Sequence, residues 1–146
     1  MINQYALITG ASSGIGLEIS KCLAERGYSL ILVSRRKHRL EEIRYGLINE
    51  FKVKVDIIPA DLEEEKTPDL IYDYCKGKGY FVNLLVNNAG YALPKPFHET
   101  PMEDEEKFLR VLGISVVALT KLFIKDMIRE KRGKIMMISS VAAFAP

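Results

Sequence analysis

The residues that most often build metal sites and disulfide frameworks are scarce in this chain. Its 146 residues contain two histidines, two cysteines and no tryptophan. Cys22 and Cys75 lack the spacing of metal ligands or of a disulfide framework, so we expect buried or half-buried thiols in a reducing compartment. His38 and His98 are isolated, and no metal site is predicted.

Net charge and long hydrophobic runs are also lacking. The formal charge is +2, which gives no strong field to attract nucleic acid. The longest uncharged stretch towards the C-terminus, Val111 to Thr120, is far shorter than the roughly 20 residues that span a bilayer. The first expected strand begins within a few residues of Met1, which leaves no room for a signal peptide. We therefore expect a cytoplasmic protein without a membrane partner.

Strand and helix patterns alternate along the whole chain. This alternation predicts an α/β fold, with a parallel sheet covered by helices on both faces. Right-handed crossovers give the strand order 3-2-1-4-5 of a doubly wound, Rossmann-like sheet. No repeat or linker divides residues 1–146, so one domain is expected. The expected strands are 5–8, 29–34, 53–58, 81–86 and 134–139, and the expected helices are about 15–27, 37–51, 68–78 and 102–133.

Apolar residues at helical spacing predict which face of each helix is buried. The first helix has its pattern at Ile15, Ile19, Cys22 and Leu23, and the third at Leu70, Ile71 and Tyr74. The long helix carries a stripe of apolar residues interpreted mainly as core: Val111, Ile114, Val117, Leu122 and Met127.

A glycine-rich turn joins the first strand to the first helix. Gly10 permits a tight turn, Gly14 lets the backbone approach a pyrophosphate, and Gly16 lets the helix pack closely on the sheet. The helix N-terminus then offers free N–H groups to phosphate. We therefore predict a dinucleotide site that includes Thr9, Gly10, Ser12, Ser13, Gly14, Ile15 and Gly16. The spacing Thr-Gly-x-x-x-Gly-x-Gly resembles that of the short-chain dehydrogenase/reductase family.

The end of the second strand predicts which dinucleotide binds. A carboxylate there would accept hydrogen bonds from the ribose of NAD, whereas arginine suits the 2′-phosphate of NADP. The chain has Ser34, Arg35 and Arg36, so we predict NADP(H) in preference to NAD(H), with Arg35 the chief phosphate ligand. The alternative is a solvated basic helix start at 37–39, partly neutralised by the acidic residues at 41 and 42.

The resemblance to short-chain dehydrogenases extends to the later strands. Asn87-Asn88-Ala89-Gly90 follows the fourth strand, as in that family, and implies that Asn88 holds the sheet while Ala89 and Gly90 leave room for the ribose. Asp61-Leu62 follows the third strand, where a family Asp meets the adenine amino group.

Catalysis in the family requires three further groups. Ser140 matches the serine that hydrogen-bonds the substrate carbonyl, but the Tyr-x-x-x-Lys pair expected on the next helix does not occur before the chain ends at Pro146. The three upstream strings (Tyr72/Lys76, Tyr74/Lys78 and Tyr91/Lys95) are interpreted as coincidence. Ser115 stands where the family has an asparagine that kinks the helix around a relay water.

Two functions are consistent with these motifs. One is an NADP(H)-dependent oxidoreductase that acts on a small carbonyl or alcohol, truncated before its catalytic helix. The other is a non-catalytic remnant that binds cofactor or a partner protein. The apolar stretch from Met136 to Pro146 and the long helix predict a homo-oligomer unless further chain covers them. The acidic clusters at 63–65 and 103–106 are interpreted as favourable charge at helix starts.

Overall fold

Strand β1 (Gln4–Thr9) forms the centre of a five-stranded parallel sheet. A computed structural model of the chain describes residues 4–144. The strand order β3-β2-β1-β4-β5 confirms the predicted topology. The other strands are β2 (Ser29–Ser34), β3 (Val55–Pro59), β4 (Phe81–Asn87) and β5 (Lys134–Met137).

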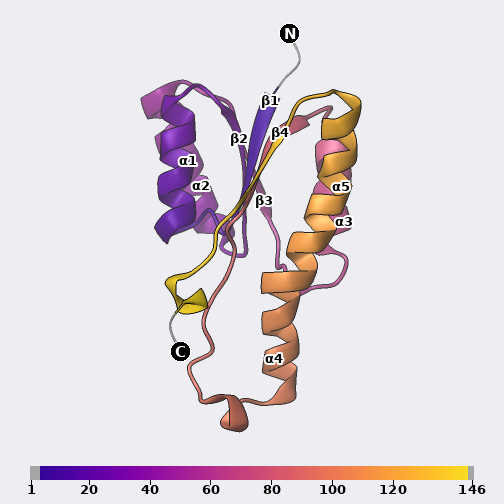
Figure 1. The fold of residues 1–146 in the computed structure, drawn as a ribbon. Helices are drawn as coiled ribbons and strands as arrows, with labels where there is room; N and C mark the ends of the chain where they lie inside the picture. The colour runs from indigo at the N-terminus through magenta and orange to yellow at the C-terminus, as the bar shows by residue number, and fades with distance from the viewer. Residues whose placement is uncertain (1–3, 145–146) are drawn as a thin grey trace.

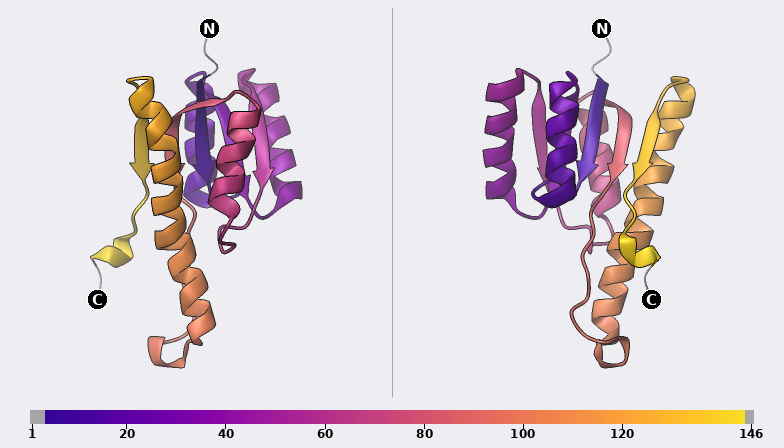
Figure 2. Two further views of the ribbon diagram at one scale, coloured as in Figure 1. Left: turned by 90° about the vertical axis from the view of Figure 1, so that its right-hand side faces the viewer. Right: turned by 60° about the vertical axis from the view of Figure 1, so that its left-hand side comes forward.

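Helices cover both faces of this sheet (Figure 1). One face carries α1 (Gly14–Glu25) and α2 (Lys37–Phe51), and the other carries α3 (Thr67–Gly77) and α5 (Ser115–Arg129). The 3₁₀ turn η1 (Phe97–Glu99) and helix α4 (Met102–Leu109) extend past the edge at which the strands end (Figure 2). The π-helical turn η2 (Arg110–Ile114) joins α4 to α5, and the 3₁₀ turn η3 (Val141–Ala143) follows β5.

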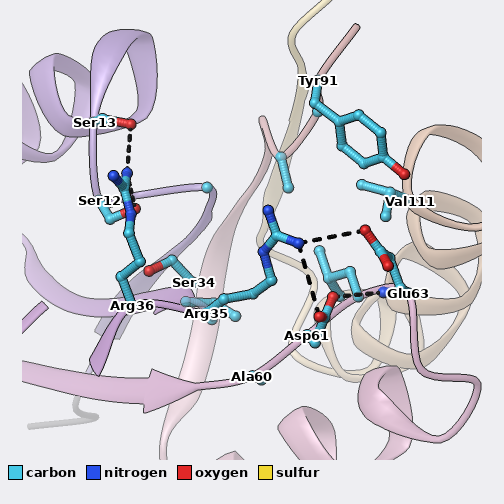
Figure 3. Close-up of a pocket in the computed structure, with 15 residues that line it drawn as sticks. Ser12, Ser13, Ser34, Arg35, Arg36, Ala60, Asp61, Glu63, Tyr91 and Val111 are labelled. Carbon is cyan, nitrogen blue, oxygen red and sulfur yellow. Dashed lines mark hydrogen bonds and ion pairs between the residues drawn. The ribbon is translucent and has the colours of Figure 1, made fainter. Parts of the chain in front are cut away.

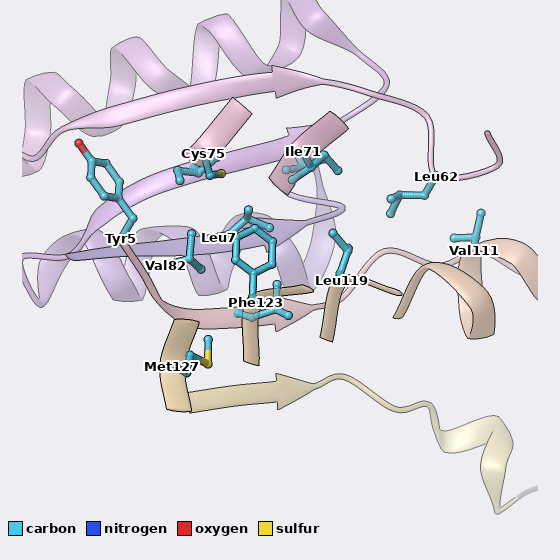
Figure 4. Packing of buried hydrophobic residues seen from close by; sticks show 13 residues of the cluster. Tyr5, Leu7, Leu62, Ile71, Cys75, Val82, Val111, Leu119, Phe123 and Met127 are labelled. Atoms are coloured by element: carbon cyan, nitrogen blue, oxygen red, sulfur yellow. The ribbon is translucent and has the colours of Figure 1, made fainter. Parts of the chain in front are cut away.

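The core is divided by the sheet into two layers, because successive side chains of a strand point to opposite faces. Tyr5 and Leu7 of β1 pack towards α3 and α5, with Ile71, Leu119 and Phe123 among their neighbours (Figure 4). The alternate residues of β1 pack in the other layer, towards α1 and α2, and that cluster includes Ala6, Ile8, Leu23, Leu40 and Leu47.

The predicted buried faces of α1 and α3 are wrong in part. Ile15 is 60% exposed and Cys22 is exposed, while the residues of α1 that face the sheet are mostly small: Gly16, Ser20, Leu23 and Ala24. A helix that approaches a sheet closely buries small side chains, and hydropathy does not register them. In α3, Leu70 is 64% exposed, and the buried face consists of Thr67, Pro68, Ile71 and Cys75.

The long helix also differs from its prediction. Its core positions are four residues apart: Val111, Ser115, Leu119, Phe123 and Met127. Ile114 and Val117, predicted as core, are 59% and 58% exposed. The π-helical turn explains the error, because its wider turn shifts the helical phase away from the regular spacing assumed for the sequence.

Except in β2, the bounds of the strands differ from the prediction by one or two residues, most of all in β3 and β5. β3 begins at Val55 and includes Pro59 at its end, and β5 ends at Met137, before the serine pair. The apolar C-terminal stretch is exposed at Met136, Met137, Val141 and Phe144, and its last two residues, Ala145 and Pro146, lie outside the described residues.

Candidate functional site

The strand ends and the loops that follow them enclose a pocket of about 370 Å³ (Figure 3). This is the edge where open parallel sheets bind ligands, because the loops on either side of the central strand diverge there. The ends of four strands with their loops, and the π-helical turn η2, contribute to it: Gly10, Ser12 and Ser13; Val33, Ser34, Arg35 and Arg36; Ala60, Asp61, Leu62 and Glu63; Ala89, Gly90 and Tyr91; and Val111.

Most of the residues predicted to bind a dinucleotide line this pocket together. Thr9, Gly14, Ile15, Gly16 and Asn88 do not line it. The lining residues absent from the prediction are Val33, Ala60, Glu63, Tyr91 and Val111. Glu63 belongs to the acidic cluster at 63–65, which the sequence pattern assigns to a helix start, but α3 begins only at Thr67.

Glycine is required at two positions of the first loop. Gly10 has a φ of 67°, in the left-handed region, and a Cβ there would stand 2.9 Å from the Cα of Ala89. A Cβ on Gly16 would collide with the side-chain amide of Asn88 and the carbonyl oxygen of Gly10. These contacts place the loop and the start of α1 directly against the end of β4.

Thr9 and Asn88 form a polar joint between β1 and β4. The Thr9 hydroxyl accepts the backbone N–H groups of Asn88 and Ala89, each at 3.0 Å, and Thr9 is 2% exposed. The Asn88 side-chain amide donates to the carbonyl oxygens of Thr9 at 2.9 Å and Gly10 at 3.3 Å. The sheet-holding role expected for Asn88 has this physical basis.

The N-terminus of α1 is suited to an anion. Its N-cap, Ser13, is extended and makes no side-chain cap hydrogen bond, and within the described residues the first turn of α1 carries no acidic side chain. The first N–H groups of a helix lack intrahelical partners, and the helix dipole favours negative charge beside them. Phosphate bound above Ser12 and Ser13 would meet these groups.

The two arginines after β2 point in opposite directions (Figure 3). Arg36 donates to the hydroxyl oxygens of Ser12 and Ser13, each at 2.9 Å. Arg35 turns towards the loop after β3, where its Nη1 lies 3.4 Å from Glu63 Oε1 and 3.9 Å from Asp61 Oδ2. Between them, the Ser34 hydroxyl is buried and has no hydrogen-bond partner among residues 4–144. An unpartnered buried hydroxyl in a pocket is a site for a ligand hydrogen bond.

The remaining basic residues at the start of α2 are neutralised within the helix. Lys37 lies 4.0 Å from Glu41, His38 lies 3.5 Å from Glu42, and Arg39 pairs with Glu42 at 2.8 Å. The hydrogen bond from Arg39 is the main cause of the lowered pKa of Glu42. The alternative reading of the basic residues, a solvated helix start, therefore applies to residues 37–39, whereas Arg35 and Arg36 face the pocket.

The two serines predicted for catalysis lie apart from the pocket lining. Ser115 is 2% exposed, and its hydroxyl donates to the carbonyl oxygen of Val111 at 2.8 Å, next to the π-helical turn. Ser140 is exposed and caps η3 by accepting the Ala142 N–H at 3.1 Å.

The Tyr-x-x-x-Lys strings on α3 serve other contacts. Tyr72 and Lys76 both donate to Asp126 at 3.1 Å, which joins α3 to α5. Burial and the Asp126 hydrogen bond raise the pKa of Tyr72, and burial with the nearby Asp56 carboxylate raises the pKa of Tyr74 to about 12. A tyrosine that exchanges protons near neutral pH needs the opposite shift.

Neither a metal-binding cluster nor a membrane-spanning helix occurs among the described residues. Residues 4–144 contain no group of three or more histidine, cysteine or acidic side chains placed to hold a metal ion. In the same range, every helix is too short or too polar to cross a bilayer.

Comparisons with known proteins agree with this geometry. The family model described as short chain dehydrogenase matches residues 4–146. The chain is 34% identical to the very-long-chain 3-oxoacyl-CoA reductase of Phaeosphaeria nodorum over 97% of its own length, but it spans only 43% of that relative.

Two solved structures also resemble this chain over nearly its whole length. A short-chain dehydrogenase from Sphingobium yanoikuyae in complex with NADPH superposes with a TM-score of 0.92 at 31% identity, over 98% of this chain and 56% of that one. L-sorbose reductase from Gluconobacter frateurii, complexed with NADPH and L-sorbose, gives 0.92 at 29% identity, over 100% and 57%.

Proposed function

Because the chain belongs to the short-chain dehydrogenase/reductase family, we propose that its pocket binds NADP(H) for an oxidoreductase that interconverts a carbonyl and an alcohol. The observation that carries the proposal is the set of groups at the end of β2, where Arg35 and Arg36 flank the unpartnered Ser34 hydroxyl. The NADPH complexes of two similar proteins support it.

The residues of the pocket would suit the phosphates, the adenine and a ribose of the dinucleotide. The α1 N-terminus with Ser12 and Ser13 would hold the pyrophosphate, and Ser34, Arg35 and Arg36 would hold the 2′-phosphate. Asp61 and Leu62 would border the adenine, while Ala89 and Gly90 leave space beside a ribose. A carboxylate at position 34 would repel a 2′-phosphate, and the chain has a serine there.

NADPH supplies a hydride, while the protein contributes binding, orientation and electrostatics. In this chain Ser140 would donate a hydrogen bond to the substrate oxygen. Ser115 takes the place of the family's asparagine, but its hydroxyl already donates to the Val111 carbonyl oxygen, so we assign it no role in a proton relay. The substrate proposed is a small-molecule carbonyl or alcohol, and the names of two similar proteins, a very-long-chain 3-oxoacyl-CoA reductase and an L-sorbose reductase, support a carbonyl group as the reacting centre. Since no Tyr-x-x-x-Lys pair follows Ser140 in these 146 residues, we expect the chain by itself to bind cofactor without turnover.

The cofactor proposal is tested by titrating NADPH, and separately NADH, with the chain. The fluorescence of the reduced nicotinamide reports binding, and the absence of tryptophan leaves the protein's own background low. Saturable binding that is tighter for NADPH supports the proposal. Equal affinity for NADPH and NADH would refute the role of the arginines in binding the 2′-phosphate. If neither cofactor bound, the alternative of a non-catalytic remnant would be favoured.

A further inference from the structure

Arg35, the residue best placed for a 2′-phosphate, already faces negative charge from its own chain. Its guanidinium lies 3.4 Å from Glu63 and 3.9 Å from Asp61, on the far side of the pocket from Arg36 (Figure 3). Arg36 donates only to two neutral serine hydroxyls and has no carboxylate within ion-pair distance among the described residues. The two arginines therefore differ in how much of their charge remains for a ligand.

The loop after β3 holds Glu63 in this position. The Asp61 carboxylate accepts the backbone N–H of Glu63 at 3.0 Å through Oδ1, and the Asp61 carbonyl accepts the Thr67 hydroxyl at 2.6 Å. The Glu63 side chain is only 22% exposed, compared with 61% for Arg35. The carboxylate is thus the more buried partner, on a hydrogen-bonded loop, and the arginine is the more exposed one.

Tyr91 borders Glu63 on its other side (Figure 3). Burial, and after it the charge of Glu63, raises the pKa of Tyr91. The tyrosine hydroxyl therefore stays protonated beside the carboxylate. Glu63 stands between a donor from the loop after β4 and the guanidinium from the end of β2.

We propose that Glu63 is a specificity-determining residue, because its carboxylate competes with the 2′-phosphate of the cofactor for Arg35. The inference rests on the proposed function and deepens it. Arg35 can bind a 2′-phosphate only by leaving Glu63 or by sharing its guanidinium with it, and the phosphate is repelled by the same carboxylate. NADP(H) preference is then weaker than two unopposed arginines would give, and residue 63 sets its size.

The size of the expected change in affinity follows from how far water reaches the Arg35–Glu63 ion pair. Ion pairs that water can reach contribute about 0.2–1 kcal/mol, which corresponds to a change in affinity of up to roughly fivefold. Glu63→Gln keeps the shape of the side chain and removes its charge. We expect it to tighten binding of a 2′-phosphorylated ligand roughly two- to fivefold and to leave ligands without that phosphate nearly unchanged.

The probes are 2′,5′-ADP, which carries the 2′-phosphate, and 5′-AMP, which lacks it. Both are titrated by calorimetry into the unmodified chain, Glu63→Gln and the control Glu64→Gln. Glu64 is the adjacent residue, is exposed and forms no ion pair among the described residues, so its substitution changes the net charge equally. We expect the 2′,5′-ADP affinity to rise only in Glu63→Gln.

A double-mutant cycle assigns the effect to the arginine. In an Arg35→Ala background, Glu63→Gln should raise the affinity for 2′,5′-ADP less, because only the direct repulsion between carboxylate and phosphate is then removed. Unchanged binding in Glu63→Gln, an equal gain in Glu64→Gln, or a gain that is just as large without Arg35 would each overturn the inference and leave the proposed function intact. If the unmodified chain binds neither NADPH nor NADH, the proposed function fails and the inference fails with it.

Discussion

The Thr9 hydroxyl provides the sharpest test of how the site is built. Thr9→Val replaces the hydroxyl by a methyl group of nearly the same size, so no cavity forms. What disappears is the acceptor for the N–H groups of Asn88 and Ala89, both at 3.0 Å. The strand pairing of β1 itself needs no change.

The magnitude can be worked from those two bonds. Each hydrogen bond contributes about 0.5–1.5 kcal/mol net, so the substitution should lower the free energy of unfolding by about 1–3 kcal/mol. The Thr9 hydroxyl also lies 3.4 Å from the Val86 carbonyl oxygen, a long contact that adds little. For a domain whose whole stability is roughly 5–15 kcal/mol, this loss is easily measured.

The assay is urea unfolding followed by circular dichroism, with Thr9→Ser as the matched control. Serine keeps the acceptor and removes one methyl group, at a cost of about 0.8 kcal/mol. We also expect the valine variant to bind NADPH more weakly, because Ala89 borders the pocket. A Thr9→Val chain that is as stable as the unmodified one would refute the joint as a source of stability.

The remaining predictions concern the cofactor, pH and assembly. Arg35→Ala should weaken NADPH binding roughly ten- to a hundredfold, with little effect on NADH binding. Arg39→Ala removes an equal charge outside the pocket and should change neither affinity in the same titrations. Equal losses of affinity for both cofactors in Arg35→Ala would contradict the assignment. Burial alone would raise the pKa of Asp126, but the hydrogen bonds from Lys76 and Tyr72 and the nearby cations lower it overall. The contribution of Asp126 to stability is therefore present above its ordinary pKa of 3.8 and is lost as the pH falls through the lower pKa of the folded state. Asp126→Asn should flatten the acid limb of a plot of unfolding free energy against pH. An unchanged acid limb would contradict this. Exposed apolar residues on the long helix, among them Ile114, Val117 and Ile128, predict self-association, which a monodisperse monomer in sizing with light scattering would exclude.

Motifs whose meaning is local could be predicted well from the sequence. The glycine turn, the residues at the end of β2 and the Asn-Asn-Ala-Gly string act through backbone geometry within a few positions. Once the strand order follows from the alternation of elements, these strings must meet at one edge of the sheet. The pocket lining brings together Gly10, Arg35, Asp61 and Gly90 for this reason.

Features that depend on packing distance could not be predicted in the same way. α1 presents Gly16 and Ser20 to the sheet because its axis lies close to the sheet, and a hydropathy pattern chooses Ile15 and Cys22 instead. The π-helical turn changes the helical phase without any marker such as proline. Glu63 was missed because nothing in its immediate sequence shows that the loop turns back towards Arg35.

The joint between Thr9 and Asn88 also has a consequence for the order of folding during synthesis. Its hydrogen bonds connect residues 77–80 positions apart, and β4 enters the sheet only after three other strands have been made. At a synthesis rate of roughly 5–20 residues per second, Asn88 follows Gly16 by about 4–14 seconds. Throughout that interval the glycine turn has neither its amide partner nor the wall that Ala89 provides. The glycine turn is therefore among the first segments to be synthesised, but it acquires its final contacts only after β4 has been made.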